Sequence, residues 1–166
     1  MEDCVLKIDR RVFLERLTAL VGGFPLAHRL LGTTGGAATL LPRTREMGVE
    51  ALPVKFPGEG ATLAGYLARP KGSGPYPAII IRGRSGLTDS VRDRARRYAE
   101  AGFVALAVDP LSCRGGTASF PSPEAAQNAL ATLTEAWLIA DLAAAREYLR
   151  RHPLARGDHL GLISSS

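Results

Sequence analysis

The chain has 166 residues, of which 46% are hydrophobic and 22% charged, a composition that indicates a globular domain and excludes a disordered chain. Lys and Arg outnumber Asp and Glu by 21 to 16, which gives a net charge of +5. Because the basic residues are scattered, or gathered on one predicted helix without interleaved aromatics, nucleic acid is not expected as a partner.

The first residues have the pattern of an export signal. Arg10 and Arg11 precede a moderately apolar stretch, as in twin-arginine signals. That stretch is shorter than the roughly 20 residues that span a bilayer. We therefore expect a periplasmic or otherwise exported protein without a transmembrane span. The alternative is an amphipathic N-terminal helix with Leu14, Leu17 and Val21 on one face, in a cytoplasmic protein.

Three segments are predicted along the chain. They are a leader over residues 1–41, a polar linker over 42–48 and a folded α/β domain over 49–166. The domain opens with two short β-compatible runs, 52–56 and 62–68, on either side of a Pro-Gly-Glu-Gly turn. This arrangement predicts a β-hairpin.

Buried strands and helices alternate further along the domain. Residues 77–81 form an apolar, β-branched run that is typical of a strand buried on both faces of a parallel sheet. A helix that ends at Gly102 follows it. A second buried strand is predicted over 103–108, one long helix over 123–151 and a last strand over 160–163. The order β-β-β-α-β-α-β predicts an α/β sheet with helices on both faces.

These segments resemble the dienelactone hydrolase family, a branch of the α/β-hydrolases. The resemblance covers residues 54–163 and is carried by "GYLARPKG", "GFVALAVDPLS", "DLAAAREYLRRHP" and "LGLI". It implies a partial α/β-hydrolase sheet, a small ester or lactone substrate, and no metal or organic cofactor. The sequence also lacks the C-x-x-C and H-E-x-x-H spacings of metal sites.

The resemblance also assigns a nucleophile position. The family's fifth strand ends in a Gly-x-Cys-x-Gly turn, which lifts the nucleophile above the sheet. Aligned with that strand, "LGLISSS" places Ser166 at the nucleophile position. The family's following Gly, its oxyanion N–H and its later Asp and His have no counterparts after Ser166. A truncated hydrolase, inactive as this chain, is therefore expected.

The loop after the strand at 77–81 departs from the family pattern. Arg82 and Gly83 replace the family's His and Glu, and Arg84 stands where the family supplies a backbone N–H to the oxyanion. Ser85 lies in a Gly-Arg-Ser-Gly stretch, but it follows the wrong strand and Leu87 replaces the second Gly of a nucleophile motif. Arg84 is therefore the candidate in this loop, through its backbone.

Two other functions are compatible with the sequence. One is a non-catalytic α/β interaction protein, and the other is one half of a hydrolase whose Asp and His come from a second polypeptide. In the truncated hydrolase the strand at 160–163 would form an unpaired sheet edge, and the interaction protein would use this edge to dock on a partner. Such an edge is expected to drive self-association or to bind a partner.

Overall fold

A computed structural model describes residues 48–165, with the backbone alone for 157–159 and Ser165. The predicted leader, including Arg10 and Arg11, and nearly all of the predicted linker lie outside the described residues, as does Ser166. In the described part, five strands form one sheet in the order β1-β2-β4-β3-β5. None of its helices is long and apolar enough to cross a membrane.

The sheet combines an antiparallel hairpin with a parallel core. The elements are β1 (Val49–Pro57), β2 (Thr62–Pro70), β3 (Tyr76–Gly83), α2 (Asp89–Glu100), β4 (Val104–Val108), the 3-10 turns η2 (Ser112–Arg114) and η3 (Thr117–Ser119), α3 (Pro123–Ala131), α4 (Glu135–Arg151) and β5 (Ala155–Ser165). The predicted hairpin is confirmed, since β1 and β2 pair antiparallel. β3 pairs parallel with both β4 and β5.

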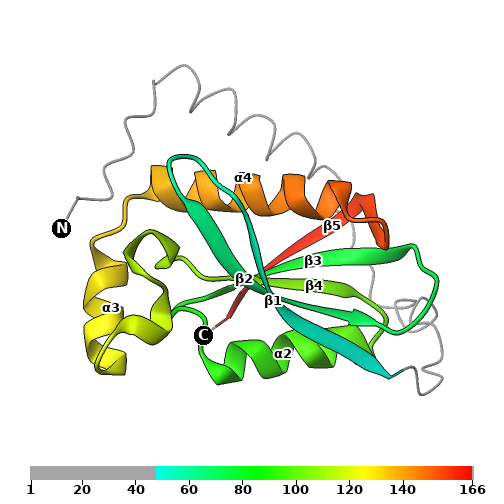
Figure 1. The fold of residues 1–166 in the computed structure, drawn as a ribbon, viewed down its shortest axis with the longest axis horizontal. Coiled ribbons are helices and arrows are strands. Elements are labelled where there is room, and N and C mark those ends of the chain that lie inside the picture. Colours follow the sequence, from blue (N-terminus) through cyan, green and yellow to red (C-terminus); the bar gives the residue numbers. More distant parts are fainter. Residues whose placement is uncertain (1–47, 166) are drawn as a thin grey trace, which may run out of the picture.

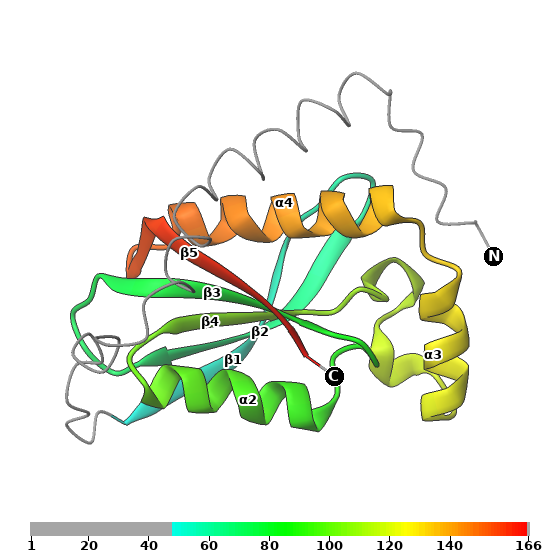
Figure 2. The same ribbon diagram turned by 180° about the vertical axis from the view of Figure 1, so that it is seen from behind.

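Helices cover both faces of the sheet, as predicted from the sequence. Figures 1 and 2 show α4 on one face and α2 on the other. β3 supplies both cores: Ile80 packs in the cluster under α4, whereas Ile79 and Ile81 pack in the cluster under α2. The alternation of side chains along a strand explains why β3 is apolar throughout.

Gly102 ends α2, as the sequence predicts. Its φ of 90° lies in the left-handed region, where residues with a Cβ are strained. The Gly102 N–H donates to the Ala99 carbonyl and the Phe103 N–H to the Tyr98 carbonyl, each at 3.0 Å. Tyr98 and Phe103 also contact edge to face, with ring centroids 6.2 Å apart. These are the bonds and the apolar contact of a Schellman motif.

The single helix predicted over 123–151 is wrong, because the chain breaks it into α3 and α4. The Thr132 hydroxyl hydrogen-bonds the Ala129 carbonyl at 2.7 Å as α3 ends. The Thr134 hydroxyl then accepts the Trp137 N–H at 3.3 Å and caps α4. Threonine hydroxyls hydrogen-bond backbone groups that a continuous helix would use, so a Thr-x-Thr sequence indicates that one helix ends and another begins.

β5 lies at the edge of the sheet and is longer than predicted, over Ala155–Ser165 rather than 160–163. It pairs with β3 alone in the described part of the chain. Leu162 is 41% exposed on this strand. The expected unpaired edge is therefore present within residues 48–165.

Candidate active site at the carboxyl edge of the sheet

The carboxyl ends of the three parallel strands meet at one edge of the sheet. In the ladder, Arg82 of β3 lies beside Val108 of β4 and beside Ser164 of β5, and Gly83 lies beside Ser165. The loops that leave β3 and β4 therefore start next to the end of β5. In open α/β sheets, this edge is where ligands bind.

Asp109, the residue directly after β4, organises the loop that follows. Its side chain is 4% exposed. Oδ1 accepts the Leu111 N–H at 3.0 Å and the Thr117 hydroxyl at 2.7 Å, while Oδ2 accepts the Thr117 N–H at 2.8 Å. Three donors thus satisfy the buried carboxylate and fold the loop around it.

Thr117 connects this loop to the loop after β3. Its hydroxyl donates to Asp109 and accepts the Leu87 N–H at 2.9 Å. Gly86 makes the close approach possible, because its φ is 84° and a Cβ there would lie 2.2 Å from Thr117 Oγ1. Ser112 adds a link to β2, where its Oγ accepts the Ala64 N–H at 2.9 Å. Both loops are therefore fixed relative to the sheet.

The turn after β3 holds the residues that the sequence analysis singled out. Arg84 is exposed in the turn directly after β3, the location expected for an oxyanion donor. Gly83 is buried, and a Cβ there would lie 2.2 Å from the Gly86 carbonyl oxygen. Position 83 is thus closed to a glutamate side chain in this backbone. The Ser85 hydroxyl accepts the Gln127 side-chain amide of α3 at 3.3 Å.

Asp141 is a buried acidic residue that the sequence analysis missed. It lies in the first half of α4, is 4% exposed, and its Oδ2 has no hydrogen-bond partner in residues 48–165. Trp137, one turn earlier, likewise has an unpartnered Nε1. Burial, together with the charge of Asp109, raises the pKa of Asp141 to about 7. The sequence pattern that indicates a buried acidic residue here is an Asp between Ala140 and Leu142 in the apolar repeat of the helix.

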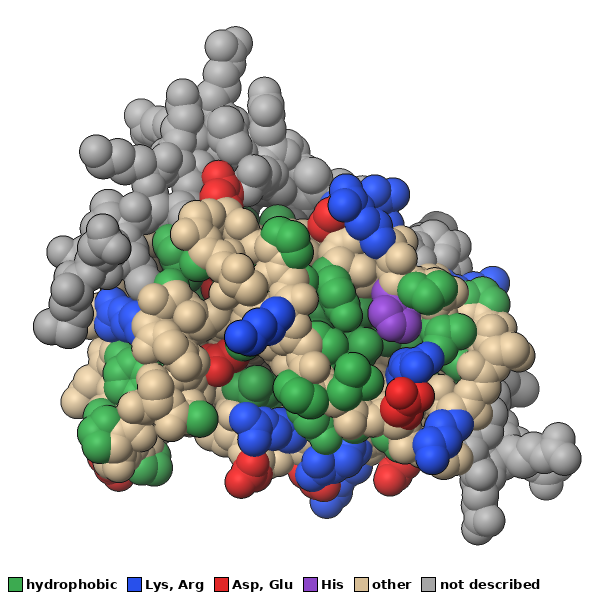
Figure 3. Space-filling model, viewed as in Figure 1, with side chains coloured by type: hydrophobic (Ala, Val, Ile, Leu, Met, Phe, Trp, Pro, Cys, Tyr) green, Lys and Arg blue, Asp and Glu red, His purple; other side chains and the backbone are tan. Residues whose placement is uncertain are grey.

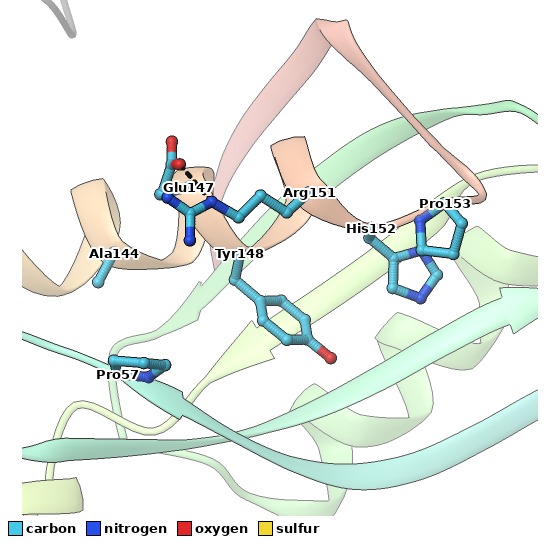
Figure 4. Close-up of a pocket in the computed structure, with 7 residues that line it drawn as sticks. All are labelled: Pro57, Ala144, Glu147, Tyr148, Arg151, His152 and Pro153. Carbon is cyan, nitrogen blue, oxygen red and sulfur yellow. Dashed lines mark hydrogen bonds and ion pairs between the residues drawn. The ribbon is translucent and has the colours of Figure 1, made fainter.

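A cavity of about 380 Å³ lies between the end of β1 and the C-terminal half of α4. Figure 4 shows Tyr148 and His152 lining it, with Glu147 and Arg151 hydrogen-bonded beside them. Burial, and then the charge of Arg69, lowers the pKa of His152. Because α4 runs back to the start of β5, this histidine lies at the opposite edge from Asp109. It is the one histidine whose side chain is described.

The strand order, the two helical layers and the braced loops at the carboxyl edge define an α/β sheet of the α/β-hydrolase type. The fold agrees with the crystal structure of a "Putative Dienelactone Hydrolase" from Klebsiella pneumoniae, at a TM-score of 0.63 and 24% identity, over 70% of this chain and 50% of that one. The model of the dienelactone hydrolase family matches residues 63–164. The chain belongs to this family.

Two curated relatives match a large part of the chain. The "Probable 2-oxo-3-(5-oxofuran-2-ylidene)propanoate lactonase" of Bradyrhizobium sp is 34% identical over 105 residues, which are 63% of this chain and 42% of that protein. A "Putative carboxymethylenebutenolidase" of Methylorubrum extorquens is 26% identical over 157 residues, which are 93% of this chain and 52% of that protein. The chain spans about half the length of these relatives.

Replacing Thr117 by Val should loosen the loop after β3. The change removes the hydroxyl that donates to Asp109 and accepts from Leu87, and leaves both partners short of a bond, which costs about 1–3 kcal/mol. Urea unfolding should show this loss, and hydrogen exchange should be faster at the Leu87 amide. Thr117→Ser keeps the hydroxyl and is the control. Equal Leu87 exchange in both variants would contradict the bridging role.

Asp141 should make the stability of the fold depend on pH. Its folded pKa of about 7 lies above the ordinary 3.8, so the folded state binds the proton more tightly. The free energy of unfolding should therefore be highest at low pH, fall by roughly a few kcal/mol as the pH rises from about 4 to about 7, and then level off.

The amide in Asp141→Asn cannot titrate, so the unfolding free energy of this variant should not decline between pH 4 and pH 7. The difference in unfolding free energy between the variant and the wild type should therefore shift in favour of the variant as the pH rises. Denaturant unfolding between pH 4 and pH 8 measures the effect. Asp93→Asn, on the exposed face of α2, is the matched control and should keep the wild-type decline. A wild-type decline in Asp141→Asn would show that another group titrates.

Proposed function

We propose that this chain contributes the sheet, the nucleophile position and the oxyanion loop of a carboxylic ester or lactone hydrolase. One observation carries the proposal: in a member of the dienelactone hydrolase family, the Asp109 carboxylate braces the loop after β3 beside the end of β5. Fixed backbone donors beside a nucleophile position are what acyl transfer requires.

In the proposed reaction, the Ser166 hydroxyl attacks the substrate carbonyl carbon, and the carbonyl oxygen becomes the oxyanion. A base takes the serine proton during the attack, and the backbone N–H of Arg84 donates to the oxyanion. Collapse of the intermediate breaks the ester C–O bond, and the protonated base returns its proton to the leaving alkoxide, which departs from an ester and stays attached to the acyl group of a lactone. Water then hydrolyses the acyl serine to the acid and regenerates the serine hydroxyl.

A serine needs a base for the attack. His152, the histidine with a described side chain, lies at the opposite edge from this loop, so we propose that a second polypeptide supplies the base, as in a split hydrolase.

The substrate and the location follow from the same proposal. The names of the Bradyrhizobium and Methylorubrum relatives support a small lactone or ester as the substrate. Arg10 and Arg11 support export to the periplasm by the twin-arginine route. Under this proposal the 166 residues do not hydrolyse esters on their own, because the base beside the nucleophile position comes from a second polypeptide.

Purified 166-residue chain should hydrolyse p-nitrophenyl acetate no faster than its Ser166→Ala variant, because serine without a base is a weak nucleophile at neutral pH. Release of p-nitrophenolate measures the rate. A wild-type rate clearly above that of Ser166→Ala would overturn the assignment of the base to a second polypeptide.

A second candidate function, a non-catalytic interaction protein, is favoured by the edge of β5. Residues 160–165 contain no Pro and no charged residue, whereas the other edge strand, β1, carries Pro53, Lys55 and Pro57. Proline and charge protect sheet edges from pairing with other chains. The proposal is therefore that β5, rather than β1, pairs with a second copy or a partner strand.

Leu162→Lys should reduce self-association, because it places a charge on the unprotected strand. Size-exclusion chromatography with light scattering should show a smaller mean mass for Leu162→Lys than for the wild type at equal concentration. Leu52→Lys, at the comparably exposed leucine of β1, is the matched control and should behave as the wild type. A monomeric wild-type chain would rule out self-association through β5.

A further inference from the structure

A cleft of about 640 Å³ lies on the side of β4 away from β5. Its walls come from the β1–β2 hairpin, the start of α2 and the loop after β4, with Pro53, Val54 and Leu87 among its apolar members. This volume is typical of small-molecule sites. Leu87 in the loop after β3 and Asp109 after β4 also line the cleft, which therefore adjoins the braced loops of the carboxyl edge.

Two cations line the cleft, Lys55 of β1 and Arg92 of α2. Arg92 Nη1 lies 3.2 Å from Asp89, whose side chain is 97% exposed, so water weakens that pair. Asp109 also reaches the lining, but the donors of Leu111 and Thr117 already occupy its carboxylate. Arg92 and Lys55 are therefore the cationic groups of the lining that a ligand anion could bind. Figure 3 shows basic and acidic side chains interspersed along the lower margin of this face, where α2 lies.

Arg92 retains a donor that no described residue uses. Its Nε is buried and has no hydrogen-bond partner in residues 48–165. Nε–H and the adjacent Nη2–H form the fork that a carboxylate bridges with two parallel hydrogen bonds. A buried donor without an acceptor is costly, so a ligand carboxylate that supplies the acceptor would be favoured.

Tyr66 gives the cleft an aromatic wall that is held in place. Its hydroxyl lies 2.9 Å from Arg96 Nη1, and the Arg96 guanidinium lies 5.8 Å from the centre of its ring. An apolar or aromatic body can therefore pack between Tyr66 and Leu87 while an acidic group reaches Arg92.

We propose that this cleft is a binding site for small organic carboxylates with an apolar or aromatic body, in which Arg92 and Lys55 bind the carboxylate. The cleft shares Leu87 and Asp109 with the braced loops, but the groups proposed to bind the carboxylate, Arg92 and Lys55, are not those assigned to catalysis. Benzoate has the required chemistry, and benzamide is its neutral counterpart of the same shape.

Titration of the ¹⁵N-labelled chain with benzoate, followed by amide chemical shifts, tests the proposal. Benzoate should shift the amides of Tyr66, Leu87 and Gly116 in a saturable way, and benzamide should bind at least tenfold more weakly. Arg92→Gln should weaken benzoate binding by about tenfold or more, since hydrogen bonds to charged groups are worth about 1.5–3 kcal/mol. Raised salt should also weaken it.

Arg97→Gln, on the same helix but paired with Asp93 on an exposed face, is the matched control and should bind as the wild type. Lys55→Gln alters an exposed residue, keeps the test valid if Arg92→Gln misfolds, and should weaken binding by a smaller, salt-dependent amount. Equal binding of benzoate and benzamide, equal effects of Arg92→Gln and Arg97→Gln, or shifts confined to residues outside the cleft would each overturn the proposal.

Discussion

The buried carboxylate of Asp109 is the constraint on which the carboxyl edge depends. A charged group that is 4% exposed is tolerable only when it is fully hydrogen-bonded, and Asp109 obtains its donors from the loop that follows it. Thr117 also accepts the Leu87 N–H, and this hydrogen bond fixes the loop after β3. One acidic side chain thus positions two loops that are separated by a helix and a strand.

Asp141 is a second buried carboxyl group, and within residues 48–165 its Oδ2 lacks the hydrogen-bond donors that Asp109 has. Asp141 is as buried as Asp109 but has an unpartnered Oδ2, and its pKa rises to about 7 as a result of burial and of the neighbouring charge. Asp109 therefore organises the two loops through its hydrogen bonds, whereas the charge of Asp141, which lacks such donors at Oδ2, costs stability.

Much of the fold could be predicted from local pattern. The apolar run of β3, the hairpin of β1 and β2 and the glycine that ends α2 follow from side-chain periodicity and from the freedom of Gly102. Apolar periodicity continues across residues 123–151 and therefore predicts one helix, whereas the hydroxyls of Thr132 and Thr134 end α3 and begin α4. Asp141 was missed as well, since one polar residue in a helix shows its burial only when the helix is packed against the sheet. The Asp109 and Thr117 bridge joins loops that are distant in sequence, so no local pattern contains it.

The central proposal is that these 166 residues supply one part of an ester or lactone hydrolase site and that a second polypeptide supplies its Asp and His. The nucleotide sequence that follows the Ser166 codon, translated in all three frames, tests it most directly. The account predicts a frame that begins with Gly soon after the nucleophile position and continues to an Asp and a His in a dienelactone-hydrolase-like sequence. The absence of such a frame would contradict a split or frameshifted hydrolase and would favour the interaction protein.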